Sequence, residues 1–463
     1  MARGPDGLRA QSHATGRPTT VLFLIVGLFA VLLVAASTRG MFWSGVLLAC
    51  GSMYVAVSWA YPVFGHRTAI LALAVLSSVL VIPVLRPVEV NYAVYVSVLL
   101  LTVGLLSLLR RRQAPPVPFM LFLIWVAFTG VFTVLRTGLQ PSYLPFVVPA
   151  LMLGAYLVVA CSDDVVREYF LKVLLALALL QALLGISQAL IDWPVFTQAG
   201  AVIRFEEPRN YFSYILPWVS PSVRMATGTY EHFNGLGALM AMGVPVTFAY
   251  WRQFRGGWRL LVLCIITLGL IFTFSRGALI GVLVALSVMY LSDTRDRESG
   301  LRKGVMAAVV LMFFAGIWNT AAEYGATTGN VSGRVLTWST AWQYARQDPL
   351  SLALGYGHSF FAYYLVVLRG IPDRLHSAPV QVALETGITG IALLASSTAI
   401  AIRRGLGDRD WVFIGSAGAV VAFLVHQSVD NSLLAYNGAW FSGLIALASL
   451  SPSAQSPSGV EPK

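Results

Sequence analysis

The chain has 463 residues, of which 57% are hydrophobic and only 11% are charged, and its mean hydropathy is +0.75. This composition excludes a soluble domain and predicts an all-α polytopic membrane protein. The net charge of +11 would suit nucleic acid, but the basic residues are distributed as membrane topology requires. The three cysteines, Cys50, Cys161 and Cys264, have the spacing of neither a disulfide framework nor a metal site.

Apolar runs along the chain predict about 12 to 14 transmembrane helices in one domain at 20–450. A cytoplasmic tail at 1–19 precedes this domain, and a disordered cytoplasmic tail at 451–463 follows it. The candidate spans lie near residues 20–37, 41–61, 68–85, 91–109, 117–135, 143–160, 168–191, 233–251, 258–274, 277–292, 304–319, 378–401, 411–427 and 434–450.

The basic residues indicate which loops face the cytoplasm. With the N-terminus inside, most of the 31 lysines and arginines fall on the cytoplasmic side, among them Arg110, Arg111 and Arg112. Two long loops, at about 192–232 and 320–377, then face the exterior. Because long ordered loops are uncommon without a function, we expect both to contribute to a site on the outer face of the membrane.

Arg276 lies between the spans at 258–274 and 277–292, and the same topology places this junction on the outer face. A guanidinium at the centre of a bilayer costs about 2.5–3.5 kcal/mol, so an arginine near the membrane usually has a partner. The partner that suits its planar fork best is a phosphate held by two hydrogen bonds. Arg276 therefore predicts an anion site.

The first external loop ends in a polar segment, Arg224 to Gly237, that leads directly into a span. Polar side chains and glycines at a helix entrance are able to bind an anion or a hydroxyl group. An N-cap and turn containing a structural histidine is an equally good interpretation of this segment.

The second external loop contains Arg334 before an amphipathic stretch, then the turn Gly355 to His358, and ends at His376. The alternative interpretation of Arg334 is a snorkelling residue of an interface helix. Ser377 has the pattern of an N-cap, which places His376 at the mouth of a span, where it could take a proton from a hydroxyl group. Glu385 lies about two turns deeper, where a carboxylate should be paired or protonated.

The external loops contain no carboxylate cluster beyond Glu206 and Glu207, so we expect no metal ion. The chain also has no glycine-rich nucleotide loop, so we expect no nucleotide cofactor. An activated lipid in the membrane is the better donor for transfer chemistry on this face.

These segments resemble the O-antigen ligase and polymerase superfamily of bacterial envelope enzymes. The resemblance rests on Thr227–Asn234, Thr273–Ala278, Gly333–Arg334 with Trp338, Gly355–Gly357, and His376 with Glu385–Gly387 and Gly390. It implies a C-type glycosyltransferase that moves a glycan from undecaprenyl pyrophosphate to an acceptor hydroxyl with inversion and without a metal.

By this resemblance Arg276 and Arg334 hold the pyrophosphate, and His376 is the base or positions the acceptor. The remaining polar residues of the motifs are expected to bind substrate, namely Arg224, Glu231, His232, Asn234, Ser275, Tyr356, His358 and Glu385. Four acceptors stay open: lipid A core, a second lipid-linked repeat, protein hydroxyls and a wall polymer. A lipid-linked glycan transporter or flippase is the alternative function, and a membrane scaffold is a third.

Overall fold

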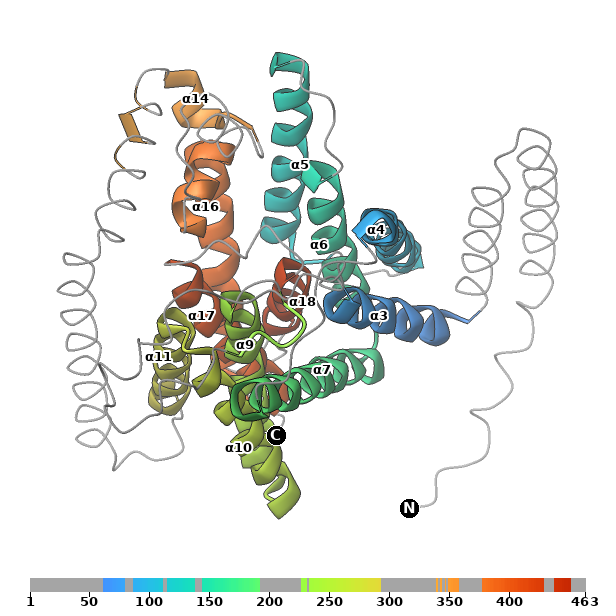
Figure 1. The fold of residues 1–463 in the computed structure, drawn as a ribbon. Coiled ribbons are helices and arrows are strands. Elements are labelled where there is room, and N and C mark those ends of the chain that lie inside the picture. The colour runs from blue at the N-terminus through green and yellow to red at the C-terminus, as the bar shows by residue number, and fades with distance from the viewer. Residues whose placement is uncertain are drawn as a thin grey trace, which may run out of the picture.

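A computed structural model of the chain describes residues 61–79, 86–110, 115–137, 144–191, 226–230, 233–292, 339, 342–343, 346, 349–357, 377–428 and 437–450. Within these ranges the protein is an all-α polytopic membrane protein with no strand (Figure 1). The helices are α3 (Pro62–Val79), α4 (Arg86–Arg110), α5 (Val117–Thr137), α6 (Leu144–Ala160), α7 (Asp164–Ile191), α9 (Phe233–Phe254), α10 (Gly257–Thr273), α11 (Arg276–Ser292), α14 (Pro349–Leu354), α16 (Ala378–Leu406), α17 (Trp411–Gln427) and α18 (Asn437–Ser449).

Most predicted spans agree with a helix to within a few residues. The span expected at 68–85 is displaced, because α3 begins at Pro62, a residue suited to the first turn of a helix. Hydropathy missed this start because His66 and Arg67 interrupt the apolar run there. The spans expected at 20–37, 41–61 and 304–319 lie outside the described residues.

Three described helices are long and apolar enough to cross a membrane, namely those at Asp164–Leu190, Phe233–Phe254 and Ala378–Leu406. Seven shorter apolar helices accompany them. The helix α16 packs against α5, α17 and α18, and the short α14 lies against one end of α16 (Figure 1). The helix α17 packs against both α9 and α11.

Glycines bring α17 close to its two neighbours. A Cβ atom placed on Gly281 of α11 would lie 2.3 Å from the Ala422 carbonyl oxygen of α17. A Cβ atom placed on Gly415 of α17 would lie 3.1 Å from Ala249 Cβ of α9. Small residues allow such close backbone approach between membrane helices, where dispersion contacts replace the hydrophobic effect. The helix α17 therefore has a fixed register against the helices on both sides.

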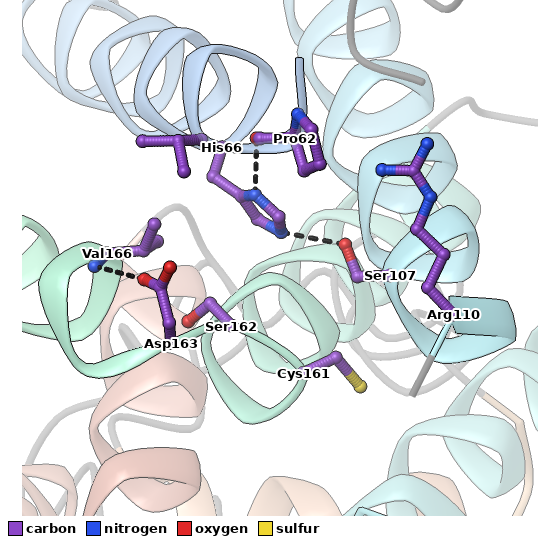
Figure 2. A pocket seen from close by; sticks show the side chains of 9 residues that line it. Pro62, His66, Ser107, Arg110, Cys161, Ser162, Asp163 and Val166 are labelled. Carbon is purple, nitrogen blue, oxygen red and sulfur yellow. Dashed lines mark hydrogen bonds between the residues drawn. The ribbon is translucent and has the colours of Figure 1, made fainter. Parts of the chain in front are cut away.

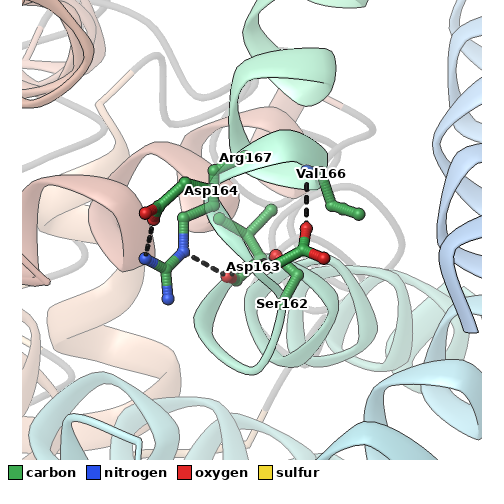
Figure 3. A network of polar contacts seen from close by, with 6 residues as sticks. Ser162, Asp163, Asp164, Val166 and Arg167 are labelled. Carbon is green, nitrogen blue, oxygen red and sulfur yellow. Dashed lines mark hydrogen bonds and ion pairs between the residues drawn. The ribbon is translucent and has the colours of Figure 1, made fainter. Parts of the chain in front are cut away.

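The first turn of α7 is held by side chains at the end of the bundle that the charge pattern assigns to the cytoplasm (Figure 3). Asp163 Oδ1 accepts a hydrogen bond from the Val166 amide at 2.9 Å, which caps the helix. Arg167 pairs with Asp164 at 2.7 Å and also donates from Nε to the Val159 carbonyl at 3.5 Å. These contacts join α7 to the end of α6.

Candidate functional site

Two residues, Phe274 and Ser275, connect α10 to α11. Phe274 adopts a left-handed conformation, with φ 56° and ψ 16°, and its amide donates to the Ile271 carbonyl at 3.0 Å. The Ser275 amide donates to Thr273 Oγ1 at 3.2 Å, and the Ser275 carbonyl accepts the Leu279 amide of the first turn of α11. This tight turn places the partly exposed Arg276 as the first residue of α11.

The Ser275 side chain joins three helix ends in one hydrogen-bonded network. Its hydroxyl donates to Asn234 Oδ1 at the start of α9, at 2.9 Å. His426 Nε2, at the end of α17, lies 3.3 Å from the same hydroxyl oxygen. His426 is fully buried, and its Nδ1 lies 3.0 Å from the Gln427 side-chain nitrogen. Ser275 and Asn234, which were selected separately from the sequence, are therefore in contact.

Asn437 connects the start of α18 to the same region. Its side-chain nitrogen donates to the Gly235 carbonyl at 3.1 Å, and its Oδ1 accepts from the Tyr230 hydroxyl at 3.4 Å. Burial raises the pKa of Tyr230, so its hydroxyl keeps the proton that it donates. The starts of α9 and α18 are thus joined through polar groups.

Two buried glutamines of α7 hold the 226–230 segment, which precedes α9. Gln188 Oε1 accepts the amides of Thr227 at 3.1 Å and Gly228 at 2.9 Å, and its amide nitrogen donates to the Gly228 carbonyl at 2.7 Å. Gln181 pairs in the same way with the amide and the hydroxyl of Thr229, both at 2.9 Å. The Ala226 amide also donates to the Phe272 carbonyl near the end of α10, at 2.8 Å.

We expect Gln188→Met to release the 226–230 segment while α7 stays folded. Two buried amides would lose their acceptor, at a cost of about 1–3 kcal/mol each. Hydrogen exchange measured by mass spectrometry should show faster exchange at Thr227 and Gly228. Ser187→Ala is the matched control, because the Ser187 hydroxyl donates within α7, to the Leu184 carbonyl. Unchanged exchange at 226–230 in the methionine variant would contradict this prediction.

A second group of site residues surrounds a break in α16. Gly387 has φ 68° and ψ −171°, so the helix is interrupted there. The carbonyl oxygens before the break accept hydrogen bonds from other elements. The Tyr356 amide donates to Leu384 at 2.7 Å, and the Gly357 amide donates to Glu385 at 3.0 Å. The Trp125 indole of α5 donates to the Thr386 carbonyl at 2.8 Å.

The turn at Gly355–Gly357 and the break in α16 therefore contact each other through their backbones. Gly355 and Gly387 make this contact possible, since a Cβ atom on Gly355 would lie 2.3 Å from the Glu385 carbonyl oxygen. Glu385 is fully buried, and its Oε1 accepts a hydrogen bond from Gln381 at 3.0 Å. This carboxyl group has the partner that its depth requires.

The structure describes five of the site residues predicted from the sequence, in two groups. Ser275 and Asn234 share a network next to Arg276, while Tyr356 and Glu385 meet at the break in α16. The other predicted residues lie outside the described residues, namely Arg224, Glu231, His232, Arg334, His358 and His376.

Four further polar residues of the site were not predicted from the sequence, namely Gln181, Gln188, His426 and Asn437. Each lies in or beside an apolar run, and a polar residue in such a position was the available signal. Among the described residues, no group of three or more histidine, cysteine or acidic side chains could hold a metal ion.

A cavity of about 180 Å³ lies at a different place, between the starts of α3 and α7 and the end of α4 (Figure 2). It is lined in part by His66, Ser107, Arg110 and Asp163. The ring of His66 is fixed there, with its Nε2 2.7 Å from Ser107 Oγ. The sequence predicts that this end of the bundle faces the cytoplasm and that Arg276 lies at the outer face.

The helices and the site define a multi-pass membrane protein with an arginine at the junction of two apolar helices. Residues 260–395 match the model of a family described as O-antigen ligase, so this part of the chain is similar to the O-antigen ligase and polymerase superfamily. A search of the curated proteins finds no match. The matched range contains Ser275, Arg276, Tyr356 and Glu385, so the resemblance seen in the sequence is confirmed at the level of the family.

Proposed function

We propose that this chain is a membrane glycosyltransferase that moves a glycan from undecaprenyl pyrophosphate to an acceptor hydroxyl group. The transfer takes place on the outer face of the bacterial plasma membrane and uses no metal or other cofactor. The observation that carries the proposal is Arg276, which begins α11 at a tight junction inside the range that matches the O-antigen ligase family.

The position of Arg276 favours an anionic ligand for two reasons. The N–H groups in the first turn of an α-helix project outward from its N-terminal end. They carry partial positive charge, which attracts phosphate groups. The guanidinium adds a full charge and a fork that matches two phosphate oxygens. A pyrophosphate at the membrane surface satisfies both features, and a lipid carrier keeps it at the depth of this junction.

In the proposed reaction, the acceptor oxygen attacks the anomeric carbon from the face opposite the pyrophosphate. The bond from the anomeric carbon to the pyrophosphate oxygen breaks, and its electron pair leaves with the pyrophosphate. Arg276 and Arg334 stabilise the charge that grows on this leaving group, so they act more strongly in the transition state than in the ground state. His376 accepts the proton of the hydroxyl group, and the anomeric configuration is inverted.

We expect His376→Ala to lose turnover and to keep binding of the lipid donor. Removal of a general base lowers a rate by roughly 10²–10⁴-fold. Transfer assays and donor binding in nanodiscs would measure the two effects separately. His66→Ala is the matched control, because it removes a histidine from the opposite end of the bundle. Loss of donor binding in the His376 variant would make this residue a ligand contact instead of the base.

A mass profile of polyprenyl-linked glycans in a strain that lacks the gene tests the proposed function. Long glycans that remain on the lipid would indicate a ligase, whose acceptor step is lost. Single repeat units on the lipid would indicate a polymerase. An unchanged pool of lipid-linked glycans would contradict both forms of the proposal and would favour the transporter.

A further inference from the structure

His426 is a fully buried histidine at the last turn of α17, with hydrogen-bond partners at both ring nitrogens. The Gln427 side-chain nitrogen has no lone pair to offer, so it donates to His426 Nδ1. The proton of the neutral ring therefore lies on Nε2, which faces Ser275 Oγ at 3.3 Å. The imidazole donates to the serine and holds it.

The hydrogen bonds then run in one direction through the site. Gln427 donates to His426, His426 donates to Ser275, and the Ser275 hydroxyl donates to Asn234 Oδ1. Because the serine oxygen accepts from the ring, its own proton is directed at the asparagine. Ser275 is thereby held from two sides, by the end of α17 and by the start of α9.

Ser275 also controls the backbone from which Arg276 projects. It follows Phe274, whose left-handed conformation is uncommon for a bulky residue and persists only where the surroundings hold it. The close approach of Gly281 to Ala422 fixes α11 against α17, with the two helices running in opposite directions. Counting back along α11 and forward along α17 from this contact brings Arg276 level with the end of α17.

We propose that His426 is a positioning residue, which acts through Ser275 to hold Arg276 in the orientation that binds the pyrophosphate of the lipid donor. This inference rests on the proposed function for its ligand. It gives His426 no part in proton transfer, since its two ring contacts serve to hold Ser275. A group displaced by about 1 Å lowers a rate by roughly 10²-fold, so the contribution of such a residue is measurable.

Four variants of the full-length protein in nanodiscs test this inference: His426→Leu, His426→Gln, Ser275→Ala and the double variant His426→Leu/Ser275→Ala. We expect His426→Leu to lower kcat by roughly 10- to 100-fold, with a smaller change in KM for a synthetic polyprenyl pyrophosphate glycan. His426→Gln should recover most of this loss, because its amide supplies an N–H donor toward Ser275. The kcat of the double variant should be no lower than that of the worse single variant, because His426 acts on Arg276 only through Ser275.

His66→Leu is the matched control, because His66 is also a buried histidine whose Nε2 contacts a serine hydroxyl, at the other end of the bundle. It should lower the melting temperature as His426→Leu does and leave kcat unchanged. Wild-type kcat in His426→Leu would overturn the inference. An equal decrease in kcat for His426→Leu and His426→Gln would also overturn it. So would a decrease in the double variant that equals the two single effects combined.

Hydrogen exchange at residues 273–279 separates this inference from the proposed function. We expect faster exchange there in His426→Leu than in His426→Gln or His66→Leu, whatever the reaction turns out to be. Unchanged exchange overturns the positioning role even if Arg276→Ala is inactive. Faster exchange together with a fully active Arg276→Ala variant would confirm the junction contact, overturn the pyrophosphate as the ligand of Arg276 and leave the proposed transferase function standing.

Discussion

Arg276→Ala should lower glycan transfer by roughly 10²–10³-fold while the helix bundle stays folded. The guanidinium is placed at the start of α11 by the two-residue turn at Phe274 and Ser275. The guanidinium stabilises the leaving group more strongly as the anomeric bond breaks. Removing it therefore raises the free energy of the transition state more than that of the bound substrate. Single-turnover transfer from a synthetic lipid donor measures this loss directly.

The lysine variant tests whether Arg276 acts through two parallel hydrogen bonds or through its positive charge alone. Arg276→Lys keeps the positive charge but makes no parallel pair of hydrogen bonds, so we expect it to recover little of the activity. Arg409→Ala is the matched control, because it removes an exposed arginine from the turn between α16 and α17. Near-normal transfer by a correctly inserted Arg276→Ala protein would defeat the assignment of the anion site.

Gly387→Ala should prevent the protein from reaching its folded, active form. The backbone of Gly387, at φ 68° and ψ −171°, lies in a region that is essentially restricted to glycine and costs about 1–3 kcal/mol for other residues. The added Cβ atom would also lie 2.3 Å from the Ala353 carbonyl oxygen and 2.6 Å from the Gly355 nitrogen. Both atoms belong to the backbone, so neither gives way easily.

The yield of monodisperse protein, the melting temperature and glycan transfer together measure the effect of Gly387→Ala. Gly257→Ala is the matched control, because a Cβ atom on Gly257 would have no atom within 4 Å. That variant replaces a glycine at the start of α10 by a better helix former, so we expect equal or slightly higher stability. A Gly387→Ala protein with wild-type stability would show that the break in α16 is not required.

Hydropathy predicts the helices well because a membrane span must satisfy its backbone internally and expose apolar side chains. The ends of α10, α11 and α17 agree with the predicted spans for this reason. The position that hydropathy predicted for α3 was wrong, because His66 and Arg67 lie inside the helix. One helix was expected at 378–401, and its break at Gly387 was not foreseen, since glycine is also common in unbroken membrane helices.

The site could be predicted only in part. Arg276 is visible in the sequence because a charge between two apolar runs is costly. The partners of Ser275 are not visible, because Asn234 and His426 approach it from positions 41 and 151 residues away in the chain. Such pairings depend on how the helices pack, and periodicity along one segment carries no information about that packing.

The break in α16 has a consequence for how the loop before it tolerates changes in length. In a continuous helix the carbonyl oxygens of Leu384 and Glu385 would accept amides four residues further along. Here Tyr356 and Gly357 supply those amides, so this part of the chain replaces a missing turn of the helix. A single residue inserted between Gly355 and Tyr356 would shift both donors out of register. Although it belongs to a loop in the sequence, this segment should tolerate insertions as poorly as the interior of a helix does.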